Sequence, residues 1–255
     1  GEKLLFIVML GTAGSGKTSL TKHYSDWLKK QGYNVGIVNL DPGAKVIPYK
    51  PNFDVRKLFT VEELMVKYGL GPNGAFMKAS DMILECSDKI LGHEVFKGKY
   101  DFVIIDTPGQ MEVFVYRRSG HYFISKLKEL GPTVGVFIVD GETMSTPIDL
   151  VVAWTTSILI QLRLDIPVVP IVNKADLIKD RETIKLIVEN IEEFKELVMK
   201  SREGLISETA IYLTDIVKEF SQSLRPVIVS AKTGEGIEEL HYLVHETFCV
   251  CGDLS

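Results

Sequence analysis

Short apolar runs rich in valine and isoleucine alternate along this chain with longer segments of helical period. Such alternation is typical of parallel sheets, because crossover helices cover both faces and leave the strands buried. The pattern predicts strands at Lys3–Leu10, Asn34–Leu40, Tyr100–Asp106, Thr133–Val139, Val168–Asn173 and Val227–Ser230. It predicts helices at Lys17–Lys30, Val61–Tyr68, Ala75–Leu91, Gly120–Leu130, Ile148–Leu164, Glu182–Ser201, Glu208–Phe220 and Gly236–Phe248. We therefore expect an α/β fold with a doubly wound, mostly parallel sheet and helices on both faces.

One long segment departs from this alternation. Residues 41–99 separate the second and third predicted strands and are punctuated by proline and glycine. Because no linker, repeat or low-complexity tract divides the chain, we expect a single domain spanning residues 1–255, with a helical insertion at about 42–99.

Local signals inside the insertion mark helix ends and a turn. Thr60 and Glu63 fit a capping box at a helix start, and Gly69 can close that helix in a left-handed conformation. Gly71-Pro72-Asn73-Gly74 then predicts a tight turn.

A glycine-rich loop follows the first predicted strand and opens a helix. It matches the pattern G-x-x-x-x-G-K-[ST] in the structural context that this pattern requires. Glycines let backbone N–H groups turn toward phosphates, and the helix N-terminus adds a favourable dipole. Lys17 can reach the outer phosphates, and Thr18 can ligate Mg²⁺. The predicted phosphate-binding residues are Gly11, Thr12, Ala13, Gly14, Ser15, Gly16, Lys17, Thr18 and Ser19.

Two carboxylates end predicted strands. Asp106 lies at the carboxyl edge of the sheet, where nucleotide sites form, and is predicted to hold Mg²⁺ through water. Just after it, the Gly109 amide can meet a γ-phosphate and Gln110 can orient the attacking water. Asp41 can position water or the hydration shell of the metal, although Asp-Pro also simply starts turns. Asp41 and Gln110 remain alternatives for activating the water.

Two loops further along the chain suit a guanine base. Asn173-Lys174-Ala175-Asp176 follows the fifth predicted strand, and the Asp176 carboxylate can accept hydrogen bonds from N1–H and the exocyclic amine of guanine. Adenine offers no such pair of donors, so a site built on this match rejects it strongly. Ser230-Ala231-Lys232, after the sixth predicted strand, can add a backbone N–H to the guanine carbonyl oxygen.

Taken in chain order, these motifs span most of the chain and resemble a GTPase of the SIMIBI branch of P-loop proteins. Gly71-Pro72-Asn73 lies between Asp41 and the strand that ends at Asp106, and it narrows the resemblance to the GPN-loop GTPases. The downstream Asp-Thr-Pro-Gly-Gln with Glu112 is similar as well.

The resemblance implies a constitutive homodimer in which Gly71, Pro72 and Asn73 of each subunit enter the partner's site and the asparagine contacts the phosphate. Many SIMIBI relatives carry a second lysine early in the P-loop, which acts across the dimer. Thr12 and Ala13 leave no such lysine here. A group that stabilises the transition-state phosphate is still needed, and the GPN loop is the family's apparent substitute.

The expected activity is hydrolysis of GTP to GDP and phosphate with Mg²⁺. The predicted catalytic residues are Lys17, Asp41, Asn73, Asp106 and Gln110. By likeness to eukaryotic relatives linked to RNA polymerase II assembly, the chain is expected to act as a nucleotide-switched assembly factor with a protein client. A GTP-using kinase and a nucleotide-dependent binding module with negligible turnover are the alternatives.

Composition narrows the partners. The chain has 255 residues, of which 45% are hydrophobic and 25% charged, and a formal net charge of -5. This charge does not favour nonspecific phosphate-backbone binding, so direct nucleic-acid binding is not expected. The longest apolar stretch, Val151–Ile160, is shorter than the roughly 20 residues that span a bilayer, so no membrane partner is expected.

Cysteine and histidine add weaker signals. Cys86, Cys249 and Cys251 cannot all pair, which favours a reducing compartment, and we expect the cytoplasm. His241, His245 and Cys249 fall on one face of the last predicted helix and are a conceivable metal site. An apolar face beside them favours plain packing instead.

Overall fold

The computed structural model describes residues 4–221 and 225–252, so Lys3, at the start of the first predicted strand, lies outside the described residues. The described chain forms two compact units. The first contains residues 4–135 and 163–166, and the second contains residues 136–162, 167–221 and 225–252. The single-domain organisation stays a prediction.

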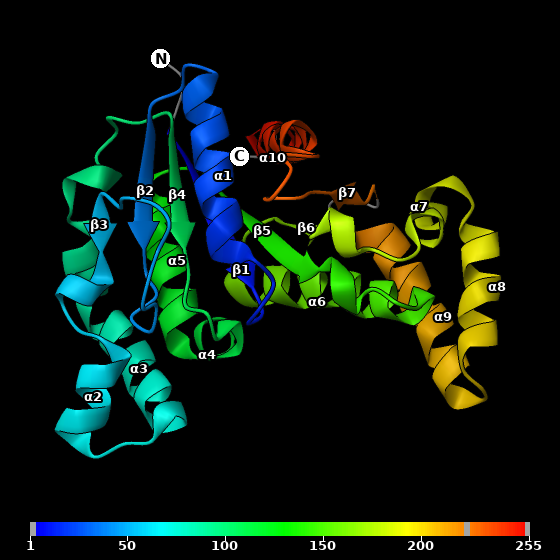
Figure 1. The fold of residues 1–255 in the computed structure, drawn as a ribbon, viewed down its shortest axis with the longest axis horizontal. Helices are drawn as coiled ribbons and strands as arrows, with labels where there is room; N and C mark the ends of the chain where they lie inside the picture. The colour runs from blue at the N-terminus through cyan, green and yellow to red at the C-terminus, as the bar shows by residue number, and fades with distance from the viewer. Residues whose placement is uncertain (1–3, 222–224, 253–255) are drawn as a thin grey trace. The chain divides into compact units, whose positions relative to one another are not determined.

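Parallel strands in the order β3-β2-β4-β1 form the centre of the first unit (Figure 1). The strands β1 (Leu5–Gly11), β2 (Val35–Asn39) and β4 (Phe102–Asp106) are buried along their whole length, which explains their continuous apolar sequence. Met9 of β1 and Asn39 of β2 both pair with Asp106 of β4. The loops after these strands therefore begin at the same edge of the sheet.

Helices cover both faces of these strands. In Figure 1, α1 (Lys17–Lys30) lies on one face and α5 (Arg118–Leu130) on the other. The insertion contributes α2 (Val61–Tyr68) and α3 (Pro72–Leu91), which pack on each other, and α3 also packs on α5. The shorter elements of this unit are β3 (Phe53–Asp54), η1 (Val55–Lys57), η2 (Glu94–Phe96) and α4 (Met111–Val115).

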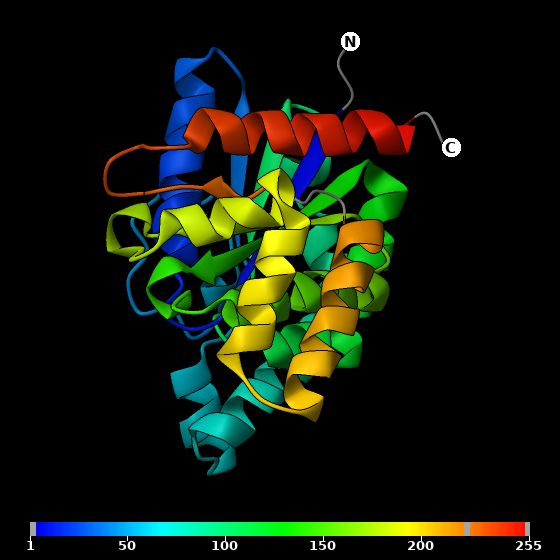
Figure 2. The ribbon, with the colours of Figure 1, turned by 90° about the vertical axis from the view of Figure 1, so that its right-hand side faces the viewer.

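The second unit has the strand order β5-β6-β7. These strands are β5 (Thr133–Asp140), which enters this unit at Val136, β6 (Val168–Asn173) and β7 (Val227–Ile228). Figure 2 shows α8 and α9 side by side, and these helices are in contact. The helices of this unit are η3 (Gly141–Thr143), α6 (Pro147–Leu164), η4 (Ala175–Leu177), α7 (Arg181–Glu189), α8 (Ile191–Ser201), α9 (Leu205–Phe220) and α10 (Ile237–Gly252). The predicted α/β fold class, with a helical insertion between β2 and β4, is confirmed.

Two predictions inside the helices are wrong. The predicted tight turn at Gly71–Gly74 is instead the start of α3, with Gly71 as the N-cap and Pro72 at the first helical position. Proline suits that position because its fixed φ is helical and its missing N–H would have no intrahelical partner there. The predicted helix Glu182–Ser201 is broken at Asn190, whose side chain accepts a hydrogen bond from Glu193 N and starts α8.

Within the described residues, one helix is long and apolar enough to cross a membrane. This helix is α6, with 18 residues and a mean hydropathy of 1.3. Length and composition alone support this reading, and core helices of soluble proteins meet the same criterion.

Candidate functional site

The phosphate loop lies in the first unit, where β1 turns into α1. Gly14 and Gly16 have φ of 81° and 83°, a left-handed conformation that glycine adopts without steric cost. Ser15 is buried and donates its N–H to Thr12 O at 3.2 Å, whereas the side chains of Thr12 and Ala13 are exposed. The loop therefore makes the backbone turn that the motif predicts, and its exposed early positions carry no cation.

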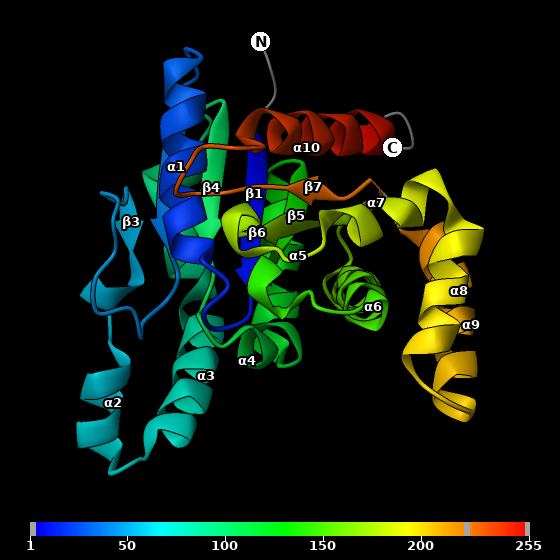
Figure 3. The same ribbon diagram turned by 45° about the vertical axis from the view of Figure 1, so that its right-hand side comes forward.

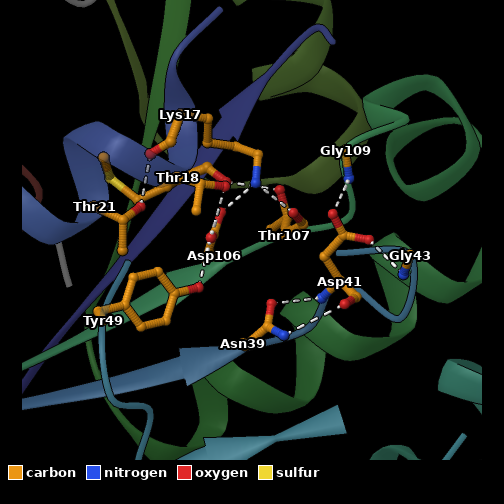
Figure 4. Close-up of polar contacts among 11 residues, drawn as sticks. Lys17, Thr18, Thr21, Asn39, Asp41, Gly43, Tyr49, Asp106, Thr107 and Gly109 are labelled. Atoms are coloured by element: carbon orange, nitrogen blue, oxygen red, sulfur yellow. Dashed lines mark hydrogen bonds and ion pairs between the residues drawn. The ribbon is translucent and has the colours of Figure 1, made fainter. Parts of the chain in front are cut away.

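Asp106 at the end of β4 binds the side chains of this loop (Figure 4). Its Oδ1 accepts an ion-paired hydrogen bond from Lys17 Nζ, and its Oδ2 accepts a hydrogen bond from Thr18 Oγ1 at 3.1 Å. Lys17 Nζ also donates to Thr107 O at 2.6 Å. The side chains of Lys17 and Asp106 expose only 5% and 1% of their surface, so each charge depends on the other for compensation.

Thr18 and Asp106 fit the magnesium ion that the sequence predicts. Thr18 Oγ1 and Asp106 Oδ2 lie 3.1 Å apart, so one ion can reach both side chains, directly or through water. Both are hard oxygen donors, the type that Mg²⁺ prefers. A bound ion would supply positive charge for the phosphate oxygens at this edge of the sheet.

Asp41 lies on the other side of this edge and is held by two backbone amides (Figure 4). Its Oδ1 accepts a hydrogen bond from Gly43 N at 2.9 Å, and its Oδ2 accepts one from Gly109 N at 3.1 Å. Burial raises the pKa of the Asp41 carboxyl, and these amides and Lys17 oppose that shift. The amide predicted to meet the γ-phosphate is therefore occupied by a carboxylate in this structure.

The side chains of Gln110 and Asn73 make no hydrogen bond or ion pair among the described residues. Gln110 is the N-cap residue of α4 and lines a small cavity with Phe76 and Pro42. Gly71, Pro72 and Asn73 are exposed at the α2–α3 connection. Figures 1 and 3 place that connection at the far tip of the insertion, away from the carboxyl end of β1. The structure therefore does not bring Asn73 to the phosphate loop of its own chain.

The predicted base-recognition loops both lie in the second unit. Asn173 ends β6 and is buried, and Lys174 follows in a left-handed conformation with φ of 58°. Ser230 Oγ donates to Asp176 Oδ1 at 3.3 Å, so the two loops are neighbours. Asp176 and Lys232 are exposed, whereas Ala231 is buried. Their roles in binding guanine stay predictions.

Sequence reasoning missed two residues that hold these sites. The hydroxyl of Tyr49 donates to Asp106 Oδ2 at 2.6 Å, and Lys174 Nζ forms an ion pair with Asp140 Oδ2 at 2.9 Å. Asp140 ends β5 as Asp106 ends β4, so the strand-end rule already used would have found it. Tyr49 carried no comparable signal, since only two flanking prolines mark its loop.

Among the described side chains, the histidines of the last helix do not form a metal centre. Within the described part of the chain, no group of three or more histidine, cysteine, aspartate or glutamate side chains is arranged to hold a metal ion. His245 Nδ1 lies 3.6 Å from Cys249 Sγ. His241 is largely buried, and this burial, followed by the charge of His245, lowers the pKa of its imidazole. His241 is therefore better explained as a residue packed into the protein interior than as a metal ligand.

A phosphate loop between a buried strand and a helix, with a strand-end carboxylate bound to its lysine, defines a P-loop nucleotide-binding protein. Residues 9–250 match a family model described as a conserved hypothetical ATP-binding protein. The chain is 36% identical to a GPN-loop GTPase of Pyrococcus abyssi, over 98% of this chain and 100% of that protein. It is 32% identical to GPN-loop GTPase 1 of Schizosaccharomyces pombe, over 93% of this chain and 67% of that protein.

The fold gives the same result. A crystal structure described as a GTPase in apo form from Pyrococcus abyssi matches with a TM-score of 0.85 and 35% identity, covering 97% of this chain and 98% of that one. The chain belongs to the GPN-loop GTPase family.

Proposed function

We propose that this protein hydrolyses GTP to GDP and phosphate with Mg²⁺, as a homodimer in which each GPN loop completes the partner's site. The cluster of Lys17, Thr18 and Asp106 at the phosphate loop, in which Lys17 and Asp106 are buried, carries the proposal. A lysine and a strand-end carboxylate in this position are the parts that P-loop enzymes use to bind phosphates and a metal ion.

The same contacts suggest what each residue does when nucleotide binds. Lys17 exchanges its contact with Asp106 for the outer phosphate oxygens, which leaves the Asp106 carboxylate for the hydrated metal. The γ-phosphate takes the Gly109 amide from Asp41, and the released carboxylate can then orient water. Asp176 and the loop at Ser230 select guanine.

Exchange of Asp41 gives a first test. Asp41→Asn is expected to tighten binding of a non-hydrolysable GTP analogue by on the order of ten-fold, because a negative charge beside the γ-phosphate is removed. Turnover is expected to fall, since an amide is a poor base. Fluorescence titration measures the affinities for the GTP analogue and for GDP. GDP is the internal control because it lacks the γ-phosphate. An equal change for GDP and the analogue would argue against competition at Gly109.

The dimer proposal is supported by two features of the chain. The positions at which many SIMIBI relatives carry a second lysine are the exposed Thr12 and Ala13. Asn73 is exposed at the tip of the insertion, where a second copy can receive it (Figure 3). A two-fold dimer places the same loop at both sites by symmetry.

Mixing two inactive variants tests whether Asn73 acts in the partner's site. A Lys17→Ala subunit still carries Asn73, and an Asn73→Ala subunit still carries Lys17. Random exchange makes about half of the dimers mixed, with one complete site each, so phosphate release is expected to recover to about one quarter of wild type. Differently tagged subunits, copurified through both tags, confirm that mixed dimers are present. Verified heterodimers as inactive as either parent would exclude action across the dimer.

Slow turnover can serve a nucleotide-switched assembly step, and we include this role in the proposal on the family resemblance alone. A GTP-using kinase would need an acceptor. Release of inorganic phosphate from GTP with no acceptor present would therefore favour the hydrolase.

A further inference from the structure

The hydroxyl of Tyr49 is bound to the carboxylate at the centre of the phosphate site (Figure 4). Tyr49 is 7% exposed, and its hydroxyl reaches Asp106 Oδ2 at 2.6 Å from the loop between β2 and β3. Thr18 Oγ1 shares that oxygen, and Lys17 occupies the other. Among the described residues, Tyr49 is the one side-chain donor to Asp106 that does not belong to the phosphate loop.

The Tyr49 hydroxyl differs from the other two donors, Lys17 and Thr18, because it has no second role at the site. Lys17 and Thr18 have roles at the phosphates and the metal in the function proposed above. The Tyr49 hydroxyl has no other hydrogen-bond partner within the described residues. It can therefore keep its contact with Asp106 when nucleotide and metal are bound.

The loop that carries Tyr49 is anchored on both sides of it. On one side, Arg56 Nη1 donates to Ala44 O at 3.0 Å and its guanidinium pairs with Asp54. On the other side, Asn52 is bound to Ile37 of β2 through both its backbone N–H and its side-chain oxygen. The same loop begins at Asp41. The position of the phenol at Asp106 is thus fixed by contacts on either side along the chain.

We propose that Tyr49 is a positioning residue, whose hydroxyl fixes the orientation of the Asp106 carboxylate toward the hydrated Mg²⁺. The inference rests on the proposed Mg²⁺-dependent nucleotide site. A carboxylate has two oxygens with several acceptor directions, and a fixed donor on one of them restricts how the group rotates. Partners of this kind behind metal-binding side chains typically change metal affinity by about 10–100-fold when they are removed.

Tyr49→Phe in the full chain tests the inference. The ring is kept and only the donor is lost. We expect the Mg²⁺ concentration that half-saturates binding of a fluorescent, non-hydrolysable GTP analogue to rise by about ten-fold. Binding measured in EDTA is expected to stay at the wild-type value. Electron paramagnetic resonance of Mn²⁺, used as the probe metal, provides a second measurement that does not depend on turnover.

Tyr24→Phe is the matched control. Tyr24 is fully buried on α1, and the described side-chain donors to Asp106 are Lys17, Thr18 and Tyr49, so this variant should keep the wild-type metal dependence. A double-mutant cycle adds a further test. Tyr49→Phe is introduced into a protein that already carries Asp106→Asn, where it should have no further effect on metal affinity.

The outcomes distinguish failure of the Tyr49 inference from failure of the proposed Mg²⁺ site. If Tyr49→Phe lowers the melting temperature but leaves metal half-saturation unchanged, the phenol only anchors its loop and the inference is wrong. The inference is also wrong if Tyr49→Phe weakens metal binding as much in the Asp106→Asn background. If the unmodified protein binds the analogue equally well with Mg²⁺ and with EDTA, the proposed Mg²⁺ site fails, and the inference fails with it.

Discussion

Lys17→Met is expected to abolish GTP turnover and to destabilise the nucleotide-free protein at the same time. Loss of a positioned cation at the transferring phosphate lowers turnover by roughly 10²–10³ or more. The structure adds the second effect. Because Asp106 is 1% exposed and paired with Lys17, removal of the lysine leaves a buried carboxylate without its cation. Breaking such a pair costs about 3–5 kcal/mol of unfolding free energy. Phosphate release and denaturant unfolding measure the two effects.

The double variant Lys17→Met with Asp106→Asn separates catalysis from stability. Its neutral amide oxygen can still accept hydrogen bonds from Thr18 and Tyr49, so most of the lost unfolding free energy should return. Turnover should stay absent, because neither the phosphate lysine nor the metal carboxylate is restored. A double variant as unstable as Lys17→Met alone would show that the ion pair is not the source of the destabilisation.

Local signals in the sequence predicted several elements together with their bounds. The helices α1 and α2 and the strand β6 have the predicted bounds. The capping box of Thr60 and Glu63 is present, and Gly69 is left-handed with φ of 60°. Each of these features is decided by residues within one or two turns of each other, so a short window of sequence contains the information.

Features that depend on distant contacts or on short elements were not predictable in this way. Tyr49 and Asp106 meet across 57 positions in the chain, and no periodicity connects them. The occupation of the Gly109 amide by Asp41 likewise results from the common edge at which β2 and β4 end. The predicted helix Glu182–Ser201 is interrupted at Asn190, because the Asn190 side chain accepts a hydrogen bond from Glu193 N and starts α8. This side-chain hydrogen bond competes with continuation of the first helix.

In the candidate site, too, the residues marked by local motifs were predictable and the contacts between distant residues were not. The sequence identified the lysine, threonine and aspartate of the phosphate cluster because a motif and a strand end mark them. It did not predict that Lys17 and Asp106 bind each other. That contact compensates two charges that are both buried.

Asp176→Asn is expected to change the base that the protein prefers. A carboxylate accepts from both N1–H and the amine of guanine, whereas an asparagine amide accepts one hydrogen bond and donates another. Xanthine presents a carbonyl in place of the amine, so the variant should bind xanthosine triphosphate. The guanine amine loses a hydrogen bond to a charged group, worth about 1.5–3 kcal/mol, and faces an amide donor that stays unpaired at a cost of about 1–3 kcal/mol, so GTP binding should weaken by on the order of 10²–10⁴.

Nucleotide competition measures this exchange, and Asp180→Asn is its control. Asp180 lies nearby on the same loop, is exposed, and accepts a hydrogen bond from Thr183 N at the start of α7. Asp180→Asn removes the same charge from this region but leaves the Asp176 carboxylate in place. It should therefore leave base preference unchanged. The unmodified protein must also prefer GTP to ATP, which matters because the matching family model is described as ATP-binding. Equal affinity for the two nucleotides would remove the guanine role of Asp176, whatever the variant does.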